Sequence, residues 1–369
     1  FSDNQFPLQP LDRFKVKSAP FRQPVEIGSF SYDEKRNFVM DDSQLKYYFP
    51  PDLRKPNNLS VNYDKYCTRD TFVDEHIDAL LDALQKDGNP ERPSTTKADF
   101  ICYRGVITKI MCTPYTKNEP WELGATLYKG SIYIEEHVSS EKRKNALGSN
   151  DRHKLLSYWG YRFETICTIS KPVSELRRDP ELTGRLDGTV NTNFQYCTVA
   201  RTKLGQNSII MGAEVDCTSE PKDPSHNPIS NYIELKTSRV ITSARDEISF
   251  ERHKLLKFWA QSFLPGVPTI IVGFRDDDGN VVVVETFKTM EIPRLVRGKE
   301  GAWDTTICIN FLDGVFNFLR KIITTDDPEV TYTIRWAYPF QAIEVEFAGK
   351  KNAFLTERFL RHSSRPNLS

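Results

Sequence analysis

Two short segments carry charged side chains at a spacing that suggests joint chemistry. Glu214 and Asp216 stand in the run Gly-Ala-Glu-Val-Asp-Cys, and Glu234 and Lys236 stand in Tyr-Ile-Glu-Leu-Lys. Both runs are apolar enough to be strands, and side chains two residues apart on a strand point to the same face. If the strands are neighbours, three carboxylates and one ammonium group converge. Buried carboxylates are costly without a counter-charge, so the two segments predict a cation site.

The ligand chemistry indicates which cation this is. Carboxylate oxygens prefer hard ions, so we expect Mg²⁺ or Mn²⁺ rather than Zn²⁺. A lysine beside such an ion can neutralise a phosphate oxygen or help to orient an attacking water. The alternative is a structural salt bridge between Lys236 and one carboxylate. Glu234 and Lys236 alone would favour that salt bridge, whereas the acidic pair on the preceding strand favours the metal site.

Further positions could extend this site. Glu164 ends a predicted helix and is either a fourth carboxylate ligand or an ordinary helix-end acid. Arg104 is a candidate phosphate fork, because a guanidinium group matches phosphate bidentately. Lys254, Lys257 and Gln261 share one face of a predicted helix, which is either a solvated face or a rail for a nucleic-acid backbone.

The elements that must position these residues follow from periodicity and turn signals. We predict helices at 71–86, 152–163, 248–264 and 304–323, a charged loop at 139–151, and strands at 98–113, 121–128, 131–137, 186–202, 207–217, 229–237, 268–275, 280–287, 330–336 and 341–348. No linker interrupts this series. We therefore expect one α+β domain over 61–350, with mixed β-sheets flanked by helices. An extended segment (1–60) would pack on it, and a basic tail (351–369) would follow.

Two of the predicted helices resemble each other. Residues 152–163 read RHKLLSYWGYRF and residues 252–263 read RHKLLKFWAQSF, with seven of twelve positions identical. The two helices either solve the same packing problem with Leu, Trp and Phe, or flank one site in a similar way. We favour the packing interpretation, because the similarity stops at the helix ends and repeat proteins need more copies.

Composition excludes several classes of protein. The 369 residues contain 50 Lys and Arg against 50 Asp and Glu, so any nucleic-acid contact must come from a local basic cleft. Seven scattered cysteines without a C-x-x-C pair indicate reduced thiols rather than a disulfide frame or a zinc site. We find no long apolar stretch, so we expect no membrane association. The sequence also contains no P-loop, nucleophile elbow or dinucleotide fingerprint.

Taken in order, these motifs resemble the DXO family of RNA 5′-end decapping nucleases. The pattern of an acidic residue followed by a loop and then by Glu-x-Lys also resembles the core signature of a large nuclease superfamily. The resemblance spans roughly residues 20–325 and is carried by Tyr103-Arg104-Gly105, Gly160 to Glu164, Gly212 to Cys217, Glu234-Leu235-Lys236, and Lys254 to Gln261. The chain looks most like the fungal nuclear member, which partners the nuclear 5′–3′ exoribonuclease.

The resemblance implies a role for each matching position. Two divalent ions, Mg²⁺ or Mn²⁺, would be bound by Glu164, Glu214, Asp216, Glu234 and the carbonyl of Leu235. Lys236 and Gln261 would contact the scissile phosphate, Arg104 would contact the RNA 5′ end, and we add Lys254 and Lys257 as candidate substrate-binding residues.

The implied activity is hydrolysis at faulty RNA 5′ ends. A nuclear hydrolase of this kind would remove triphosphate, incomplete caps and NAD caps in RNA quality control, and would stabilise and stimulate the exoribonuclease. Its mechanism would be an in-line displacement assisted by two metal ions. Two alternatives stay open at this stage: a mainly non-catalytic scaffold for the exoribonuclease, and a DNA exonuclease with the same core.

Overall fold

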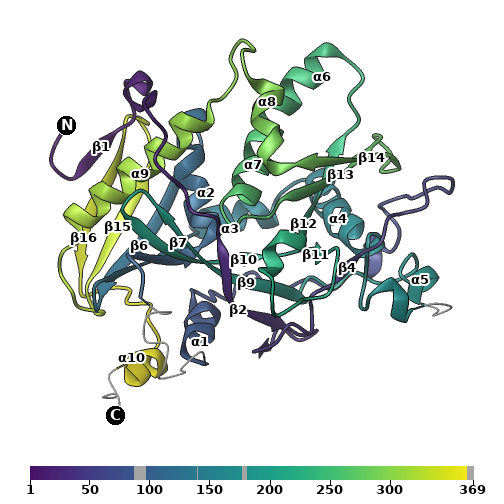
Figure 1. The fold of residues 1–369 in the computed structure, drawn as a ribbon, viewed down its shortest axis with the longest axis horizontal. Helices are drawn as coiled ribbons and strands as arrows, with labels where there is room; N and C mark the ends of the chain where they lie inside the picture. The colour runs from purple at the N-terminus through teal and green to yellow at the C-terminus, as the bar shows by residue number, and fades with distance from the viewer. Residues whose placement is uncertain (87–96, 139, 177–180, 364–369) are drawn as a thin grey trace.

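Two mixed β-sheets form the body of the protein (Figure 1). The computed structural model describes residues 1–86, 97–138, 140–176 and 181–363. The larger sheet has ten strands in the order β1-β16-β15-β6-β7-β5-β10-β9-β2-β3, and the smaller has six in the order β14-β13-β12-β11-β4-β8. The expected α+β class with mixed sheets flanked by helices is confirmed.

The ten-stranded sheet is covered on both faces by apolar side chains. Its strands are β1 (Gln5–Pro7), β2 (Val25–Tyr32), β3 (Phe38–Val39), β5 (Phe100–Tyr103), β6 (Trp121–Tyr128), β7 (Ser131–His137), β9 (Gln195–Leu204), β10 (Asn207–Glu214), β15 (Thr331–Trp336) and β16 (Ala342–Gly349). On β10, Ile209 and Met211 enter the core shared with α2 (Arg104–Cys112) and α9 (Thr305–Ile322). Ile210 enters the opposite core, formed with α1 (Asp78–Lys86) and α10 (Glu357–Ser363). A continuous apolar run is therefore what this central strand requires.

The six-stranded sheet is packed between two helices. Its strands are β4 (Tyr47–Tyr48), β8 (Thr168–Ile169), β11 (Cys217–Thr218), β12 (Tyr232–Arg239), β13 (Thr269–Arg275) and β14 (Val281–Lys288). Ile233 and Leu235 of β12 share a core with α4 (Asp151–Ile166). Tyr232, on the alternate side, shares a core with α7 (Leu255–Phe263). Side chains alternate along a strand, so Glu234 and Lys236 point to the same face as Tyr232, away from α4.

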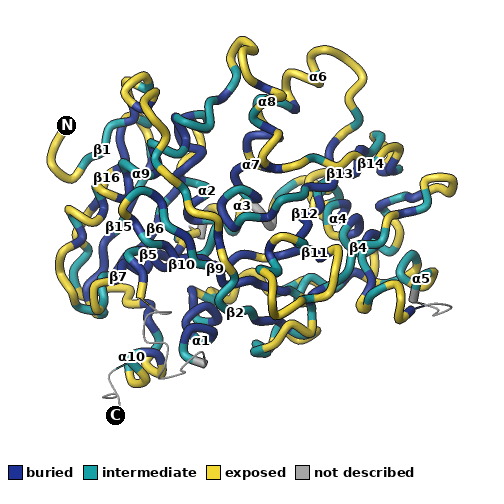
Figure 2. Tube along the Cα trace, viewed as in Figure 1, coloured by how far each residue is buried: buried dark blue, intermediate teal, exposed yellow. Residues whose placement is uncertain are grey.

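Shorter elements complete the chain. They are α3 (Ser140–Leu147), α5 (Glu181–Gly184), α6 (Ala244–Ser249), α8 (Ile292–Val296) and a π-helical turn (Phe250–Lys254) that joins α6 to α7. Within the first 60 residues, β1 pairs with β16, β2 pairs with β9, and β4 pairs with both β8 and β11. The middle strands of the large sheet are buried and the region of α6 is exposed (Figure 2). No helix of the described ranges is long and apolar enough to cross a membrane.

Five local predictions are wrong. The helix predicted at 71–86 begins only at Asp78, and the strand predicted at 186–202 begins only at Gln195, because turns and irregular backbone precede each of them. Residues 104–112 form helix α2 rather than the second half of a strand at 98–113, because Val106, Ile107, Ile110 and Met111 follow helical spacing and face the core. The loop predicted at 139–151 contains helix α3. The strand predicted at 207–217 breaks after Glu214, and its last residues join the other sheet as β11. The hairpin of β6 and β7 is confirmed.

Candidate active site

The chain crosses from one sheet to the other within the first of the two charged segments. β10 ends at Glu214 in the large sheet, and β11 begins at Cys217 beside β12 of the small sheet. Because Cys217 lies opposite Ile233, Asp216 reaches the neighbourhood of Glu234. Asp216 Oδ2 accepts a hydrogen bond of 2.7 Å from the Leu235 backbone N–H. The two charged segments are therefore adjacent. The short strand β11 pairs with β12, whereas the long strand β10 belongs to the other sheet.

Four carboxylates influence one another at this crossing. Burial, followed by the charges of Asp216, Glu214 and Glu234, raises the pKa of Glu164 well above its ordinary range. Burial and the charges of Glu234 and Glu214 do the same to the pKa of Asp216. Glu214 is open to the solvent of a cavity, yet desolvation by the surrounding protein and the charge of Glu234 still raise its pKa. The cluster therefore holds excess negative charge that a cation would relieve.

Lys236 supplies one positive charge to this cluster. Its Nζ lies 3.0 Å from Glu234 Oε1. Burial acts to lower the pKa of Lys236, but the charges of Glu234 and Asp216 outweigh burial and raise it. The salt bridge considered as an alternative is thus present, and it lies inside the carboxylate cluster rather than in place of it.

Arg104 and Gln261 approach the cluster from two helices. Arg104 begins α2, and its Nη1 donates to the Gln261 backbone carbonyl of α7 at 3.3 Å. In the described part of the chain, Arg104 Nε and Gln261 Oε1 are buried and have no hydrogen-bond partner. Buried polar atoms are normally satisfied, so this adjacent donor and acceptor are placed for a bound group.

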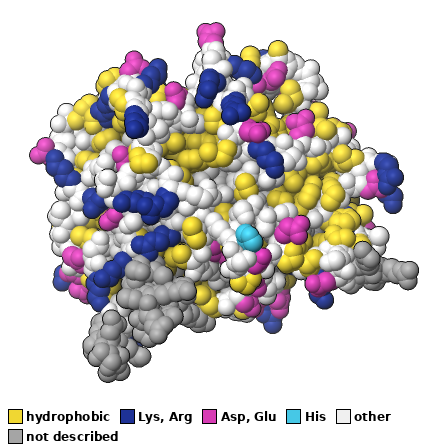
Figure 3. Space-filling view, viewed as in Figure 1, with side chains coloured by type: hydrophobic (Ala, Val, Ile, Leu, Met, Phe, Trp, Pro, Cys, Tyr) yellow, Lys and Arg dark blue, Asp and Glu magenta, His cyan; other side chains and the backbone are white. Residues whose placement is uncertain are grey.

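Two cavities meet at Arg104, Gly105 and Lys142. The first, of about 770 Å³, is lined by Glu214 together with basic and aromatic side chains that include Arg36, Arg69, Arg143, Lys154, Tyr32, Tyr66 and Tyr103. The second, of about 700 Å³, is lined by Gln261 and by Lys109, Lys257 and Trp121. Asp74, Glu75, Glu135 and Glu136 also line the first cavity, so its charge is mixed. Basic side chains are in clear excess in the second cavity, where Arg104, Lys109, Lys142 and Lys257 stand against Glu119. On the face seen in Figure 3, Lys and Arg also stand in separate groups.

The predicted basic residues lie at different places around the cleft. Lys254 has an exposed side chain, but desolvation by the surrounding protein and the charges of Arg275, Lys236 and Lys257 lower its pKa. Lys257 faces the second cavity and forms an ion pair with Glu119, with Nζ 3.2 Å from Oε1.

Several residues that line the cavities are not among those that the sequence patterns predict. Arg36, Arg69 and Lys142 come from the N-terminal region and from α3, far along the chain from the charged segments. The basic run Lys142-Arg143-Lys144 is a local signal for Lys142, but it lies in the segment predicted to be a loop. Long-range pairing, not local pattern, brings these side chains to the cleft.

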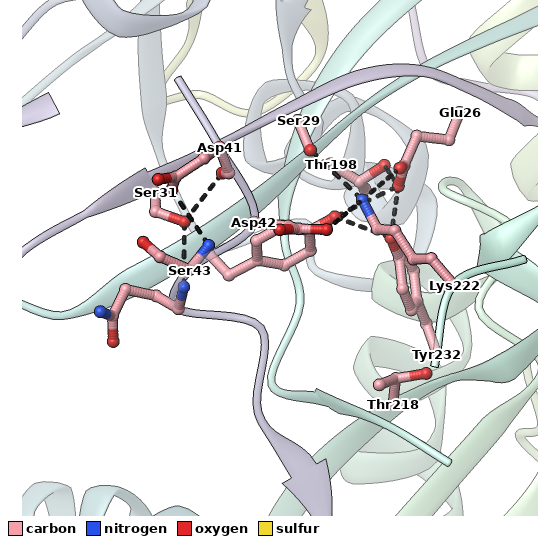
Figure 4. Close-up of polar contacts among 12 residues, drawn as sticks. Glu26, Ser29, Ser31, Asp41, Asp42, Ser43, Thr198, Thr218, Lys222 and Tyr232 are labelled. Atoms are coloured by element: carbon pink, nitrogen blue, oxygen red, sulfur yellow. Dashed lines mark hydrogen bonds and ion pairs between the residues drawn. The ribbon is translucent and has the colours of Figure 1, made fainter. Parts of the chain in front are cut away.

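A hydrogen-bonded brace ties three strands together next to the crossing (Figure 4). Glu26 of β2 accepts hydrogen bonds from Thr198 of β9, at 2.7 Å, and from the Tyr232 hydroxyl of β12. Lys222 Nζ lies 2.8 Å from Glu26 Oε1. The Tyr196 and Tyr232 hydroxyls are 2.8 Å apart. This brace joins the two sheets two residues before Glu234, so it stabilises the geometry of the site.

The donors at the site suit a hard divalent cation. The carboxylates and the Leu235 carbonyl are all oxygen ligands. Among the described residues, no three Asp, Glu, His or Cys side chains stand as a ready-made metal-binding group. Glu234 is paired with Lys236, and Asp216 accepts from Leu235. The donor chemistry therefore fits such an ion, provided that these side chains adjust when it binds.

A helix-end carboxylate, a strand-end acidic pair and a Glu-x-Lys strand on a mixed α/β core define a nuclease of the PD-(D/E)XK class. The model of the RAI1-like PD-(D/E)XK nuclease family matches residues 22–360, and the chain belongs to that family. The resemblance drawn from the motifs is thereby confirmed, as is the expected enzyme class, a hydrolase.

Relatives and solved structures agree with this assignment. The chain is 41% identical over 330 residues to the decapping nuclease RAI1 of Neurospora crassa, covering 87% of this chain and 78% of the relative. It is similar to the crystal structure of Candida albicans Rai1 in complex with pU5–Mn²⁺, with a TM-score of 0.88, 28% identity, and coverage of 98% and 97%. It is also similar to Scheffersomyces stipitis Rai1 in complex with (3′-NADP)⁺ and calcium ion, with a TM-score of 0.85, 27% identity, and 98% of each chain covered.

Proposed function

We propose that this protein is a divalent-metal-dependent hydrolase of RNA 5′ ends. The observation that carries the proposal is the carboxylate cluster of Glu164, Glu214, Asp216 and Glu234, with Lys236 inside it, beside two cavities of which the second is basic. The decapping activity named for the Neurospora crassa relative and the pU5–Mn²⁺ complex of the Candida albicans protein support the substrate class and the ion.

The ion site would use the four carboxylates and the Leu235 carbonyl. Burial, followed by their mutual repulsion, raises the pKa of Glu164, Glu214 and Asp216, and Mg²⁺ or Mn²⁺ would relieve both effects. When bound, ions of this kind activate a water and stabilise a leaving oxygen. Glu234 would then exchange part of its interaction with Lys236 for the ion.

Lys236 acts as an electrostatic partner of the phosphate. The charges of Glu234 and Asp216 outweigh burial and raise its pKa, which favours the protonated ammonium form. The contact with Glu234 holds the ammonium group at the cluster, where it offsets charge that develops on the phosphate oxygens.

Arg104 and Gln261 position the substrate. The unpartnered Nε of Arg104 donates to a 5′ phosphate, and the Gln261 side chain contacts the scissile phosphate. Lys254 and Lys257, on the exposed face of the same helix region, follow the RNA backbone.

The finer substrate and biological assignments rest on the family resemblance. The substrates would be triphosphate, incompletely methylated and NAD-capped ends, and the complex of the Scheffersomyces stipitis protein with (3′-NADP)⁺ supports the last. The protein would act in the nucleus and would stabilise a nuclear 5′–3′ exoribonuclease. Adding the catalytically inactive variant described below to that exoribonuclease tests the partnership without hydrolysis.

The activity is tested with the double variant Glu214→Ala/Asp216→Ala. With Mn²⁺ or Mg²⁺, the unmodified protein should release pyrophosphate, a cap dinucleotide or an NAD-derived product from the matching RNA, resolved by chromatography. The double variant should release none while keeping its thermal unfolding transition. Glu220→Ala/Asp223→Ala, two exposed acids on the following loop, is the matched control and should be fully active.

Two results would contradict the proposal. Unchanged turnover in the double variant would remove the carboxylates from the chemistry. Equal hydrolysis of a matched 5′-triphosphate DNA would favour a nuclease without preference for RNA.

A further inference from the structure

The two helices with similar sequences present similar exposed stripes to the cleft. On α4 the stripe consists of Lys154, Ser157, Tyr161 and the partly buried Glu164. Over the π-helical turn and α7 it consists of Lys254, Lys257 and the partly buried Gln261. Lys154 and Ser157 line the first cavity, whereas Lys257 and Gln261 line the second. The interpretation of these helices as similar in packing alone is therefore incomplete.

The remaining faces of both helices are committed to packing. Trp159 is buried against the six-stranded sheet, and Trp259 stacks on Phe263 with ring centroids 5.0 Å apart. Each helix region also starts with an arginine that donates to a loop carbonyl: Arg152 to Asp277 at 3.1 Å, and Arg252 to Glu300 at 2.6 Å. The exposed stripe is thus the face that each helix leaves available for a ligand.

Tyr161 is the residue on α4 that matches Gln261 on α7. It keeps 43% of its surface exposed on a helix whose other large aromatic side chains are buried. It lies one turn before Glu164 on the same stripe. Burial, followed by the charges of Glu164 and Glu214, raises its pKa, and Arg69 and Tyr66 of the cavity wall also act on it. Tyr161 therefore lies on α4 between Glu164, one turn further along the helix, and Ser157, one turn before it, which lines the first cavity.

We propose that Tyr161 is a base-stacking residue that holds a nucleobase of the RNA next to the scissile phosphate. An exposed aromatic ring beside a phosphate-binding site is the usual platform for single-stranded nucleic acid, because every base offers a π-face. Tyrosine is suited to this use, since ordering its side chain costs little conformational entropy. The inference rests on the proposed function for the identity of the ligand.

The experiment measures binding without hydrolysis. The parent protein carries Glu214→Gln/Asp216→Asn, and its affinity for a 5′-monophosphorylated decanucleotide is measured by fluorescence anisotropy. Tyr161→Ala should weaken binding between about fivefold and a hundredfold. Tyr161→Phe should bind like the parent, because it keeps the ring. Tyr338→Ala, at an exposed position outside both cavities, is the matched control and should have no effect.

Substrates that lack one base show which contact is lost. Decanucleotides with an abasic site at the first, second or third position are compared with the intact RNA. When the missing base is the one that stacks on Tyr161, the abasic RNA should bind the parent and the Tyr161→Ala variant with equal affinity, because the contact is already absent. Independent, multiplicative effects at all three positions would overturn the proposal, as would unchanged binding by a folded Tyr161→Ala variant. RNA hydrolysis by the protein without any substitution is measured in parallel. Its presence or absence tests the proposed function independently of the role of Tyr161.

Discussion

Replacing Glu164 by Gln should stabilise the metal-free protein while abolishing its activity. The carboxylate of Glu164 is surrounded by those of Asp216, Glu214 and Glu234, and it lies in the last turn of α4, where the helix dipole also disfavours negative charge. Gln keeps the shape of the side chain and removes the charge. Relief of such strain at a functional site is a recognised route to higher stability at the cost of function.

The magnitude follows from the electrostatics of the cluster. One pair of like charges about 6 Å apart costs about 3 kcal/mol at an effective dielectric constant of about 20. Attraction to Lys236 and access of solvent offset much of this repulsion, which leaves an expected gain of about 1–2 kcal/mol. For 369 residues the entropy of unfolding is roughly 0.8 kcal/mol per degree. The midpoint of thermal unfolding should therefore rise by about 1–3 °C.

The assay is differential scanning calorimetry in EDTA at several pH values. In the folded protein the pKa of Glu164 is raised, so the native state binds this proton more tightly than the unfolded chain. The stability of the unmodified protein should then fall as pH rises from the ordinary glutamate pKa through the raised one, and the advantage of the Gln variant should grow over that window. At acidic pH the two proteins should unfold alike.

Added Mn²⁺ should reverse the order of stability. A ligand present at 100 times its dissociation constant stabilises a protein by about 2.7 kcal/mol, and the Gln variant should gain much less. A variant that is less stable than the unmodified protein in EDTA at pH 8 would refute the electrostatic reasoning. Equal stabilisation of both proteins by Mn²⁺ would refute the assignment of Glu164 as a ligand.

Three further predictions concern the surroundings of the cluster. Lys236→Met should lower kcat on triphosphate RNA by about 10²–10³-fold, as loss of a transition-state partner does, and a loss confined to KM would contradict this role. Tyr232→Phe removes a hydroxyl that donates to Glu26, so calorimetry should show a loss of about 1–3 kcal/mol; an unchanged midpoint would mean that the brace is not stabilising. Gly212→Ala would place a Cβ atom 2.8 Å from the Tyr103 ring, so we expect a loss of about 1–3 kcal/mol and lower kcat, and an unaffected enzyme would show that the ring can move.

Much of the local structure was readable because it depends on near neighbours in the chain. The β6–β7 hairpin is marked by alternating apolar residues around Lys129-Gly130, and helices α4 and α9 by apolar residues at helical spacing. The errors arose where a local pattern was ambiguous. Residues 104–112 combine β-branched residues with helical spacing, and burial against α7 and α9 decides for the helix.

The sequence by itself determined the side chains that are candidates for the site: acidic residues in Glu-x-Asp order, a Glu-x-Lys pair, and a glutamine on a helix. Each of these features is encoded within one short segment of the chain. Only the tertiary structure decided that β10 and β11 belong to different sheets, and that Arg104 and Glu164 reach the same crossing. Sheet pairing and helix docking depend on burial between segments far apart in the chain, which no local pattern records.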